Sequence, residues 1–331
     1  MTADNFKEHI RIEMRQLFKI EKKAEKGLFA YEWVVVAYMV LTFAMIFFCY
    51  TKIPNAQAMI WERVRIILMM AAVYLVYRMM PCRFTRLARA VLQLALLSWW
   101  YPDTYELNRI FPNLDHLFAQ WEQDLFGCQP ALLFSQLVPY PWFGELMDLG
   151  YASYFPMIVA VVLFYFFCRY GLFQQTVFIV IGSFFIYYVV FDFLPVTGPQ
   201  YYYGAVGFDD IAQGVFPNIH DYFNHTMERV VSPGYPDGFF YQLVEDAHES
   251  GERPTAAFPS SHVGISTVLL LLAWRSGSHR LFYILLPFFI LMFFSTVYIQ
   301  AHYAIDAIAG LISGVILYFS LLFLSKRICC C

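Results

Sequence analysis

The sequence predicts an all-α fold, a polytopic membrane helical bundle, and two observations carry this prediction. Hydrophobic residues make up 60% of the 331 positions and charged residues only 14%, whereas ordinary soluble domains have about 25% charged residues. The apolar residues also gather in segments that can cross a bilayer, which takes about 17–25 residues per helix. The net charge of −3 gives no indication that the protein binds nucleic acid.

The apolar segments predict about eight transmembrane helices. Six are clear: residues 31–50, 64–80, 149–168, 173–194, 281–300 and 303–324. Two are weaker, because residues 85–101 begin with Arg86 and Arg89, and residues 261–274 are short for a complete span.

These spans predict a domain organisation. Residues 1–30 are expected to form an amphipathic surface helix, because apolar residues recur there at helical spacing among Lys and Arg. Residues 31–84 hold two peripheral spans, and residues 85–325 hold a six-helix core with long connections at 102–146 and 195–260. Residues 326–331 form a tail that ends in Cys329, Cys330 and Cys331.

The distribution of basic residues predicts the orientation. Eight spans place both termini on one side, and most of the 22 Lys and Arg residues fall on that side. The positive-inside rule then puts the termini in the cytoplasm and both long connections in the periplasm or the lumen.

Two histidines lie in settings that suit catalysis. The segment AAFPSSHVGIST (256–267) places Ser260, Ser261 and His262 at the start of one span. The segment STVYIQAHYAIDAIAG (295–310) places His302 at the end of another, with Asp306 four residues later. Residues four apart share a helix face, so Asp306 is expected to accept a hydrogen bond from one imidazole nitrogen of His302. The other nitrogen then stays free as a nucleophile or base.

Span counting also brings a third segment to the same membrane face. FDFLPVTGPQYYY (191–203) ends one span on the outward side, where His262 begins a span and His302 ends one. Asp192 lies inside the apolar part of this segment, which indicates either a functional group or a structural hydrogen bond.

These motifs resemble a known family. FPSSH and HYAIDAIAG resemble the second and third motifs of the type 2 phosphatidic acid phosphatase superfamily, over roughly residues 85–325. LPVTGPQ and WEQDLFGCQP (121–130) are similar to the branch that contains aureobasidin-sensitive inositol phosphorylceramide synthase.

The resemblance implies a role for each residue. His302 would attack a lipid phosphate or phosphodiester and become a phosphohistidine, with Asp306 orienting it. His262 would protonate the leaving alcohol and then take a proton from the acceptor. Ser260, Ser261 and nearby backbone N–H groups would hold phosphate oxygens. No metal or other cofactor is required by this scheme.

The implied function is transfer of a phospho-alcohol headgroup between membrane lipids. The donor would be a glycerophospholipid, with inositol phosphate the favoured headgroup, and the acceptor would be ceramide. One alternative is a lipid phosphate phosphatase that uses the same site with water as acceptor. A lipid transporter is a remote alternative, since no inverted repeat with paired broken helices is evident.

The sequence lacks basic residues that the phosphatase motifs contain. Thr296 stands where the phosphatases have an arginine, and Gly198, Pro199 and Gln200 replace their first motif. Arg253 and Arg229 are therefore the candidates to neutralise a phosphoryl group. His220, His225 and His248 are expected to be solvated, without a carboxylate partner.

Overall fold

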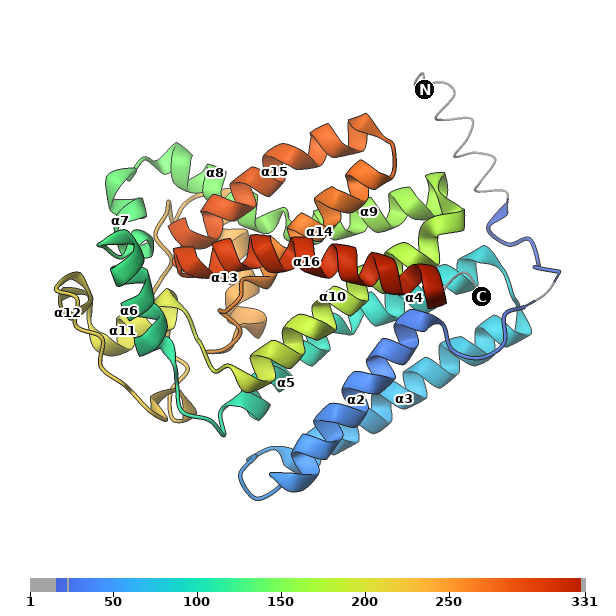
Figure 1. Ribbon diagram of the computed structural model, residues 1–331, viewed down its shortest axis with the longest axis horizontal. Coiled ribbons are helices and arrows are strands. Elements are labelled where there is room, and N and C mark those ends of the chain that lie inside the picture. The colour runs from blue at the N-terminus through green and yellow to red at the C-terminus, as the bar shows by residue number, and fades with distance from the viewer. Residues whose placement is uncertain (1–15, 23, 329–331) are drawn as a thin grey trace.

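The computed structural model describes residues 16–22 and 24–328, and within them every regular element is a helix (Figure 1). The all-α prediction is confirmed. Residues 1–15 and 23 of the proposed surface helix at 1–30 lie outside the described residues, as do Cys329, Cys330 and Cys331. The described residues 19–22 and 24–29 form no regular helix.

A peripheral hairpin precedes the core. Its helices are α2 (Ala30–Phe48) and α3 (Ala56–Met79). In Figure 1 they run side by side along one edge of the bundle, with α2 packed against α10 (Phe173–Phe193). A buried ion pair between Glu32 of α2 and Arg89 fastens the hairpin to α4 (Arg83–Ala95).

The predicted span at 85–101 is two helices. It divides at Leu96 into α4 and α5 (Leu97–Asn108), and α5 continues past the predicted end. Tyr188 of α10 donates a hydrogen bond to the carbonyl oxygen of Leu97 at 2.9 Å, so the break is held against the core.

The core is formed by α8 (Pro141–Ala152), α9 (Tyr154–Cys168), α10, α14 (Ser261–Arg275), α15 (His279–Tyr298) and α16 (Ala304–Ile328). Glycines allow α14 and α16 to pack closely. A Cβ at Gly310 would lie 2.5 Å from the Ser260 carbonyl oxygen, and one at Gly314 would lie 2.5 Å from that of Gly264. This contact brings the start of α14 beside the start of α16.

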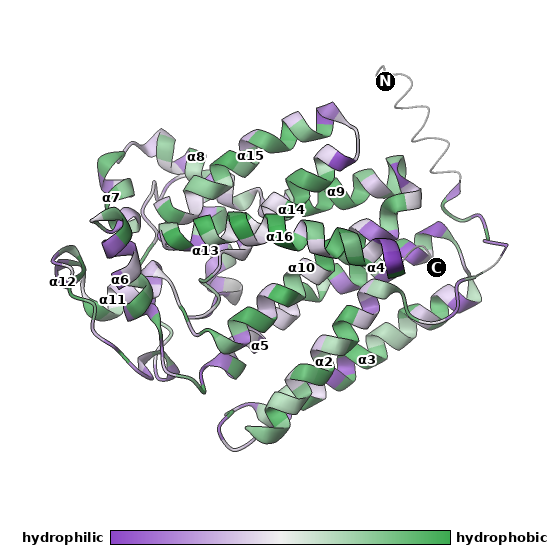
Figure 2. Cartoon of the chain, in the orientation of Figure 1, coloured by the Kyte–Doolittle hydropathy of each residue, from purple (hydrophilic) through white to green (hydrophobic). Residues whose placement is uncertain are grey.

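The chain is an integral membrane protein. In the described residues, four helical segments are long and apolar enough to span: Ala30–Phe48, Tyr170–Phe193, His279–Tyr298 and Ala304–Ile328. The pair α8 and α9, bent by 42°, makes a fifth. Figure 2 shows hydrophobic residues covering these long helices and hydrophilic ones gathered mainly toward the ends of the bundle.

The predicted total of eight spans thus remains a prediction. Helix α3 is long, but Glu62, Arg63 and Arg65 lower its hydropathy, and α14 has only 15 residues.

The two long connections hold short helices at one end of the bundle (Figure 1). They are α6 (Asp115–Phe126), α7 (Pro130–Leu137), α11 (Pro199–Val206), α12 (Phe208–Ala212) and α13 (Phe239–Gly251). The connection at 195–260 holds three of these helices, α11, α12 and α13.

Candidate active site

His302 lies in the short turn between α15 and α16. Gln300 adopts a left-handed conformation (φ 63°), and the His302 N–H donates to the Thr296 carbonyl oxygen at 2.9 Å. The imidazole is buried, with 4% of the residue exposed. Its Nδ1 lies 2.8 Å from the carbonyl oxygen of Ala257. Because a carbonyl only accepts, Nδ1 carries the proton and Nε2 keeps a free lone pair.

Asp306 does not make the expected hydrogen bond to His302. Its Oδ2 lies 3.7 Å from His302 Nδ1 and accepts the backbone N–H of Tyr303 at 2.9 Å. The sequence pattern predicted the right neighbours but the wrong acceptor, since the Ala257 carbonyl takes that role. At 3.7 Å the carboxylate still attracts a positively charged imidazole.

His262 faces His302 from the start of α14. Its Nδ1 lies 3.5 Å from His302 Nε2. The His262 ring packs against two tyrosines, with centroids 4.6 Å from Tyr151 and 4.5 Å from Tyr154. The structure therefore brings together the two histidines that the motifs singled out, and it surrounds one of them with aromatic rings.

Burial lowers the pKa of His302 to about 4, although the hydrogen bond to Ala257 and the nearby Glu252 carboxylate both act to raise it. A group with this pKa is neutral at physiological pH. The free Nε2 lone pair is then available to a nucleophilic role without prior deprotonation.

The two predicted serines lie at the N-terminus of α14. The Oγ of Ser260 accepts the N–H of Val263 at 3.4 Å, so Ser260 is the helix N-cap. Its own N–H donates to the Asp306 carbonyl oxygen at 3.0 Å. Ser260 thus ties α14 to α16, while Ser261 begins the helix and is partly exposed.

The segment LPVTGPQ lies directly against the histidine turn. Gly198 has φ 89°, and a Cβ there would lie 2.7 Å from the Ala301 carbonyl oxygen and 3.2 Å from the Ala257 side chain. Only glycine fits this approach without strain. Pro199 begins α11, and the Gln200 N–H donates to the Gln300 carbonyl oxygen at 2.9 Å. The Gln200 side chain is buried, and its Oε1 receives no hydrogen bond.

Asp115 organises this arrangement, although the sequence analysis did not identify it. One carboxylate accepts the N–H groups of Thr197 and Gly198 at 2.7 and 2.8 Å and the Thr197 hydroxyl at 2.9 Å. It also accepts the Tyr303 hydroxyl at 3.2 Å. Burial raises the pKa of Asp115, and the backbone and side-chain hydrogen bonds oppose that rise.

Glu122, on the same face of α6, holds the start of α16. Its Oε2 accepts the Ile305 N–H at 3.1 Å, so it serves as a tertiary cap for that helix. Burial raises the pKa of Glu122 to about 8, against the lowering effect of the backbone bond from Ile305. Asp115 and Glu122 are seven residues apart among the buried residues Phe118 and Ala119. That i, i+3, i+4, i+7 spacing is the signal that could have identified them.

A second group missed by the sequence analysis surrounds His248. The expectation that His225 and His248 lack a carboxylate partner is wrong for His225, whose Nε2 lies 3.4 Å from Asp221. It is also wrong for His248. Its Nε2 lies 3.3 Å from Glu252 and its Nδ1 lies 3.7 Å from Glu245. The His248 ring lies 5.5 Å from that of Tyr151, which itself packs on His262.

Three predicted residues lie in other surroundings. Arg229 is paired with Glu245 at 2.7 Å. Arg253 donates to the carbonyl oxygen of its neighbour Glu252 and lines a pocket between α3 and α5. Asp192 is buried and accepts the Tyr38 hydroxyl at 3.4 Å, which is a contact with the peripheral hairpin. Neither arginine pairs with a histidine of the site.

Thr296, which stands where the phosphatases have an arginine, packs inside the bundle. Thr296 is buried, and its hydroxyl donates to the Phe293 carbonyl oxygen at 3.0 Å within its own helix. In residues 16–22 and 24–328 there is no group of three or more His, Cys, Asp or Glu side chains placed to hold a metal ion.

Comparison with known families gives one match. The family described as the PAP2 superfamily matches residues 116–320, which is more than half of the chain and includes both histidines. Neither curated proteins nor solved structures give a significant match.

Proposed function

Because this chain belongs to the PAP2 superfamily, whose enzymes act on lipid phosphoesters as phosphatases or phosphotransferases, we propose that it moves a phospho-alcohol headgroup from a glycerophospholipid to ceramide. Inositol phosphate is the favoured headgroup. The observation that carries the proposal is the pairing of buried His302 with half-buried His262, with His302 Nε2 free and 3.5 Å from His262 Nδ1.

In the first half-reaction, His302 Nε2 attacks the phosphorus of the donor. A P–N bond forms and the bond from phosphorus to the diacylglycerol oxygen breaks. His262 gives that oxygen its proton, so the leaving group departs as a neutral alcohol. Asp306, 3.7 Å from Nδ1, balances the positive charge that His302 gains.

In the second half-reaction, the acceptor hydroxyl attacks the phosphohistidine. His262, now neutral, takes the hydroxyl proton. A new P–O bond forms, the P–N bond breaks, and both histidines return to their starting states. The step through a covalent intermediate divides one displacement into two easier ones.

The backbone supplies the groups that would hold the phosphate. The N-terminus of α14 carries His262, and the partial positive charge of a helix N-terminus favours anions. A singly charged diester would make a smaller demand on cations than a doubly charged monoester. This agrees with Thr296 in place of an arginine and with Arg229 engaged by Glu245.

Burial of the site supports transfer to an alcohol over hydrolysis. Water is the competing acceptor, and a closed site prevents it from intercepting a reactive intermediate. His302 is almost fully buried, and tyrosines cover the ring of His262. A lipid phosphate phosphatase would use the same residues with water in place of ceramide.

The test uses purified protein with labelled ceramide and, separately, phosphatidylinositol, phosphatidylethanolamine and phosphatidylcholine. We expect a phosphorylated ceramide product with phosphatidylinositol, and an acid-labile phosphoprotein that His302→Ala does not form. Full activity of His302→Ala would overturn the mechanism. Release of phosphate from a lipid monophosphate, with no ceramide product from any donor, would establish the phosphatase instead.

A further inference from the structure

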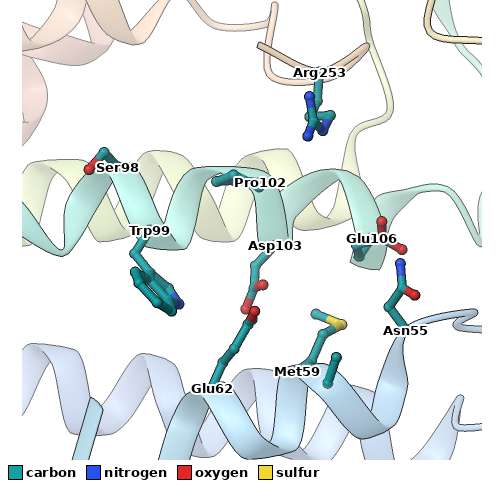
Figure 3. Close-up of a pocket in the computed structure, with 10 residues that line it drawn as sticks. Asn55, Met59, Glu62, Ser98, Trp99, Pro102, Asp103, Glu106 and Arg253 are labelled. Atoms are coloured by element: carbon teal, nitrogen blue, oxygen red, sulfur yellow. The ribbon is translucent and has the colours of Figure 1, made fainter. Parts of the chain in front are cut away.

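A pocket of about 460 Å³ lies between the peripheral hairpin and the core. This is within the range of about 300–1,000 Å³ that is usual for small-molecule sites. Its walls come from the first half of α3, from α5 and from the segment that follows α13 (Figure 3). The lining residues are Asn55, Ala58, Met59, Glu62, Ser98, Trp99, Pro102, Asp103, Glu106 and Arg253.

The polar wall of this pocket is rich in hydrogen-bond acceptors. Figure 3 shows the carboxylates of Glu62 and Asp103 pointing toward one another across the gap between α3 and α5. Asp103 is 4% exposed, and Glu62 is half-buried. Two carboxylates that face each other across a pocket favour an occupant that donates hydrogen bonds to both.

Arginines close to the pocket pair with carboxylates of its polar wall and reduce the negative charge of that wall. Arg63, which does not line the pocket, lies 3.0 Å from Asp103 Oδ2, and Arg109 lies 3.5 Å from Glu106. Among the described residues that line the pocket, Arg253 is the one cation. The balance suits a neutral donor-rich headgroup, whereas a phosphate would face three carboxylates and one arginine.

The other wall of the pocket is apolar. Met59, Ala58 and Pro102 line it together with Trp99, which is 40% exposed. Trp61, one turn from Ala58 on α3, is 58% exposed. Exposed tryptophans are typical of the boundary between hydrocarbon and headgroups. A lipid can therefore place its headgroup in the pocket while its chains stay in the bilayer.

A short chain of contacts joins this pocket to the catalytic histidines. Arg253 follows Glu252, whose carboxylate is 3.3 Å from His248 Nε2. His248 contacts Tyr151, and Tyr151 packs on His262. The segment that ends α13 therefore has the pocket on one side and the reacting groups on the other.

We propose that this pocket binds the acceptor lipid through a neutral headgroup that donates several hydrogen bonds, as the two hydroxyls and the amide N–H of ceramide would. The proposal rests on the proposed transferase function. It assigns Glu62 and Asp103 as the acceptors for those donors and places the acceptor lipid beside the site before it reaches the phosphohistidine.

The first test fills the pocket. Ala58→Trp adds a large side chain to its wall, and Gln57→Trp is the matched control, since Gln57 is the exposed neighbour on α3 and does not line the pocket. We expect Ala58→Trp to raise the KM for ceramide by about tenfold or more and Glu62→Ala by a smaller factor, because each removes contacts made only by the acceptor. The rate of phosphoprotein formation from the donor should stay unchanged in both variants. An equal ceramide KM in Ala58→Trp and Gln57→Trp would overturn the proposal.

The second test locates the lipid directly. Photoactivatable ceramide, phosphatidylethanolamine and phosphatidic acid are each crosslinked to the full chain in nanodiscs, and the labelled peptides are mapped. We expect ceramide to label residues 55–62 or 98–106, and Ala58→Trp to remove that label. Preferential labelling there by the ammonium lipid or by the anionic lipid would overturn the acceptor assignment. Failure of the wild-type chain to form a phosphoprotein from any donor would instead reject the proposed function. The crosslinking result would still show whether the pocket binds ceramide.

Discussion

The carbonyl oxygen of Ala257 lies 2.8 Å from Nδ1 of His302, closer than the carboxylate of Asp306 at 3.7 Å. The backbone thus fixes the imidazole tautomer, and the carboxylate acts through its charge. This division of roles separates the effects expected from changing each residue.

Asp306→Asn should lower kcat by about a hundredfold or less, well short of the roughly ten-thousandfold loss seen where a carboxylate itself fixes a histidine tautomer. The asparagine keeps an oxygen for the Tyr303 N–H and removes only the charge that stabilises the imidazolium. Single-turnover phosphoprotein formation measures this effect. A loss as large as that of His302→Ala would show that Asp306 controls the tautomer after all.

The closeness of His262 and His302 could be predicted from the sequence, because it depends on the order of the membrane spans. Once the spans are counted, His262 at the start of one and His302 at the end of another must reach the same face, and the structure brings them to 3.5 Å. The contact between His302 and the Ala257 carbonyl oxygen could not be predicted from the sequence. It depends on a left-handed residue, Ala256 with φ 67°, and on a backbone oxygen that no side-chain motif encodes.

For Arg253, the sequence pattern predicted surroundings that the structure does not show. Its closeness to His262 in the sequence suggested a role on phosphate, yet the chain directs it into a pocket against α5. Asp115 and Glu122 belong to no motif that the sequence analysis identified. Their spacing places them on one face of α6, but their partners, the Gly198 and Ile305 N–H groups, are long-range contacts that local periodicity does not reveal.

Asp115→Asn should destabilise the protein by about 3 kcal/mol and reduce kcat, because an amide turns one acceptor into a donor that faces N–H groups. Tyr303→Phe removes a single hydrogen bond to the same carboxylate and should cost only about 1 kcal/mol. Thermal unfolding in detergent and ceramide turnover would measure both variants. Asp124→Asn is the control, since Asp124 lies on the exposed face of the same helix. Indistinguishable stability of the Asp115 and Asp124 variants would contradict the role given to Asp115.

Glu122→Gln should make stability less sensitive to pH. The pKa of Glu122 is raised in the fold to about 8, and a carboxyl in the unfolded chain titrates near 4.5. Wild-type stability is therefore full below about pH 4.5 and falls as pH rises toward about 8, since the unfolded chain releases a proton that the fold retains. The Tm of Glu122→Gln relative to wild type should rise between those pH values. A constant difference in Tm would mean that Glu122 ionises normally.

His302 should contribute the opposite trend at acidic pH. Its pKa is lowered from 6.5 to about 4, so its contribution is full above about pH 6.5 and is lost as pH falls toward 4. The loss should be about 3 kcal/mol at the acid end. His302→Gln has no titrating group there, so its Tm should fall less than that of wild type between pH 6.5 and 4. Parallel pH curves for the two proteins would argue against a neutral, buried His302.

The orientation in the membrane predicts which loops an impermeant reagent can reach. The positive-inside distribution predicts that α12 lies on the periplasmic or luminal side, together with the active site, and that the turn between α14 and α15 lies in the cytoplasm. Asp209 of α12 and Arg280 at the start of α15 are both exposed. In a chain whose native cysteines are replaced, Asp209→Cys should react with an impermeant maleimide from the non-cytoplasmic side of sealed membranes. Arg280→Cys should react only after permeabilisation, because an odd number of spans lies between them. The reversed pattern would place the active site in the cytoplasm, and labelling of both positions from one side would mean that the spans between them are miscounted.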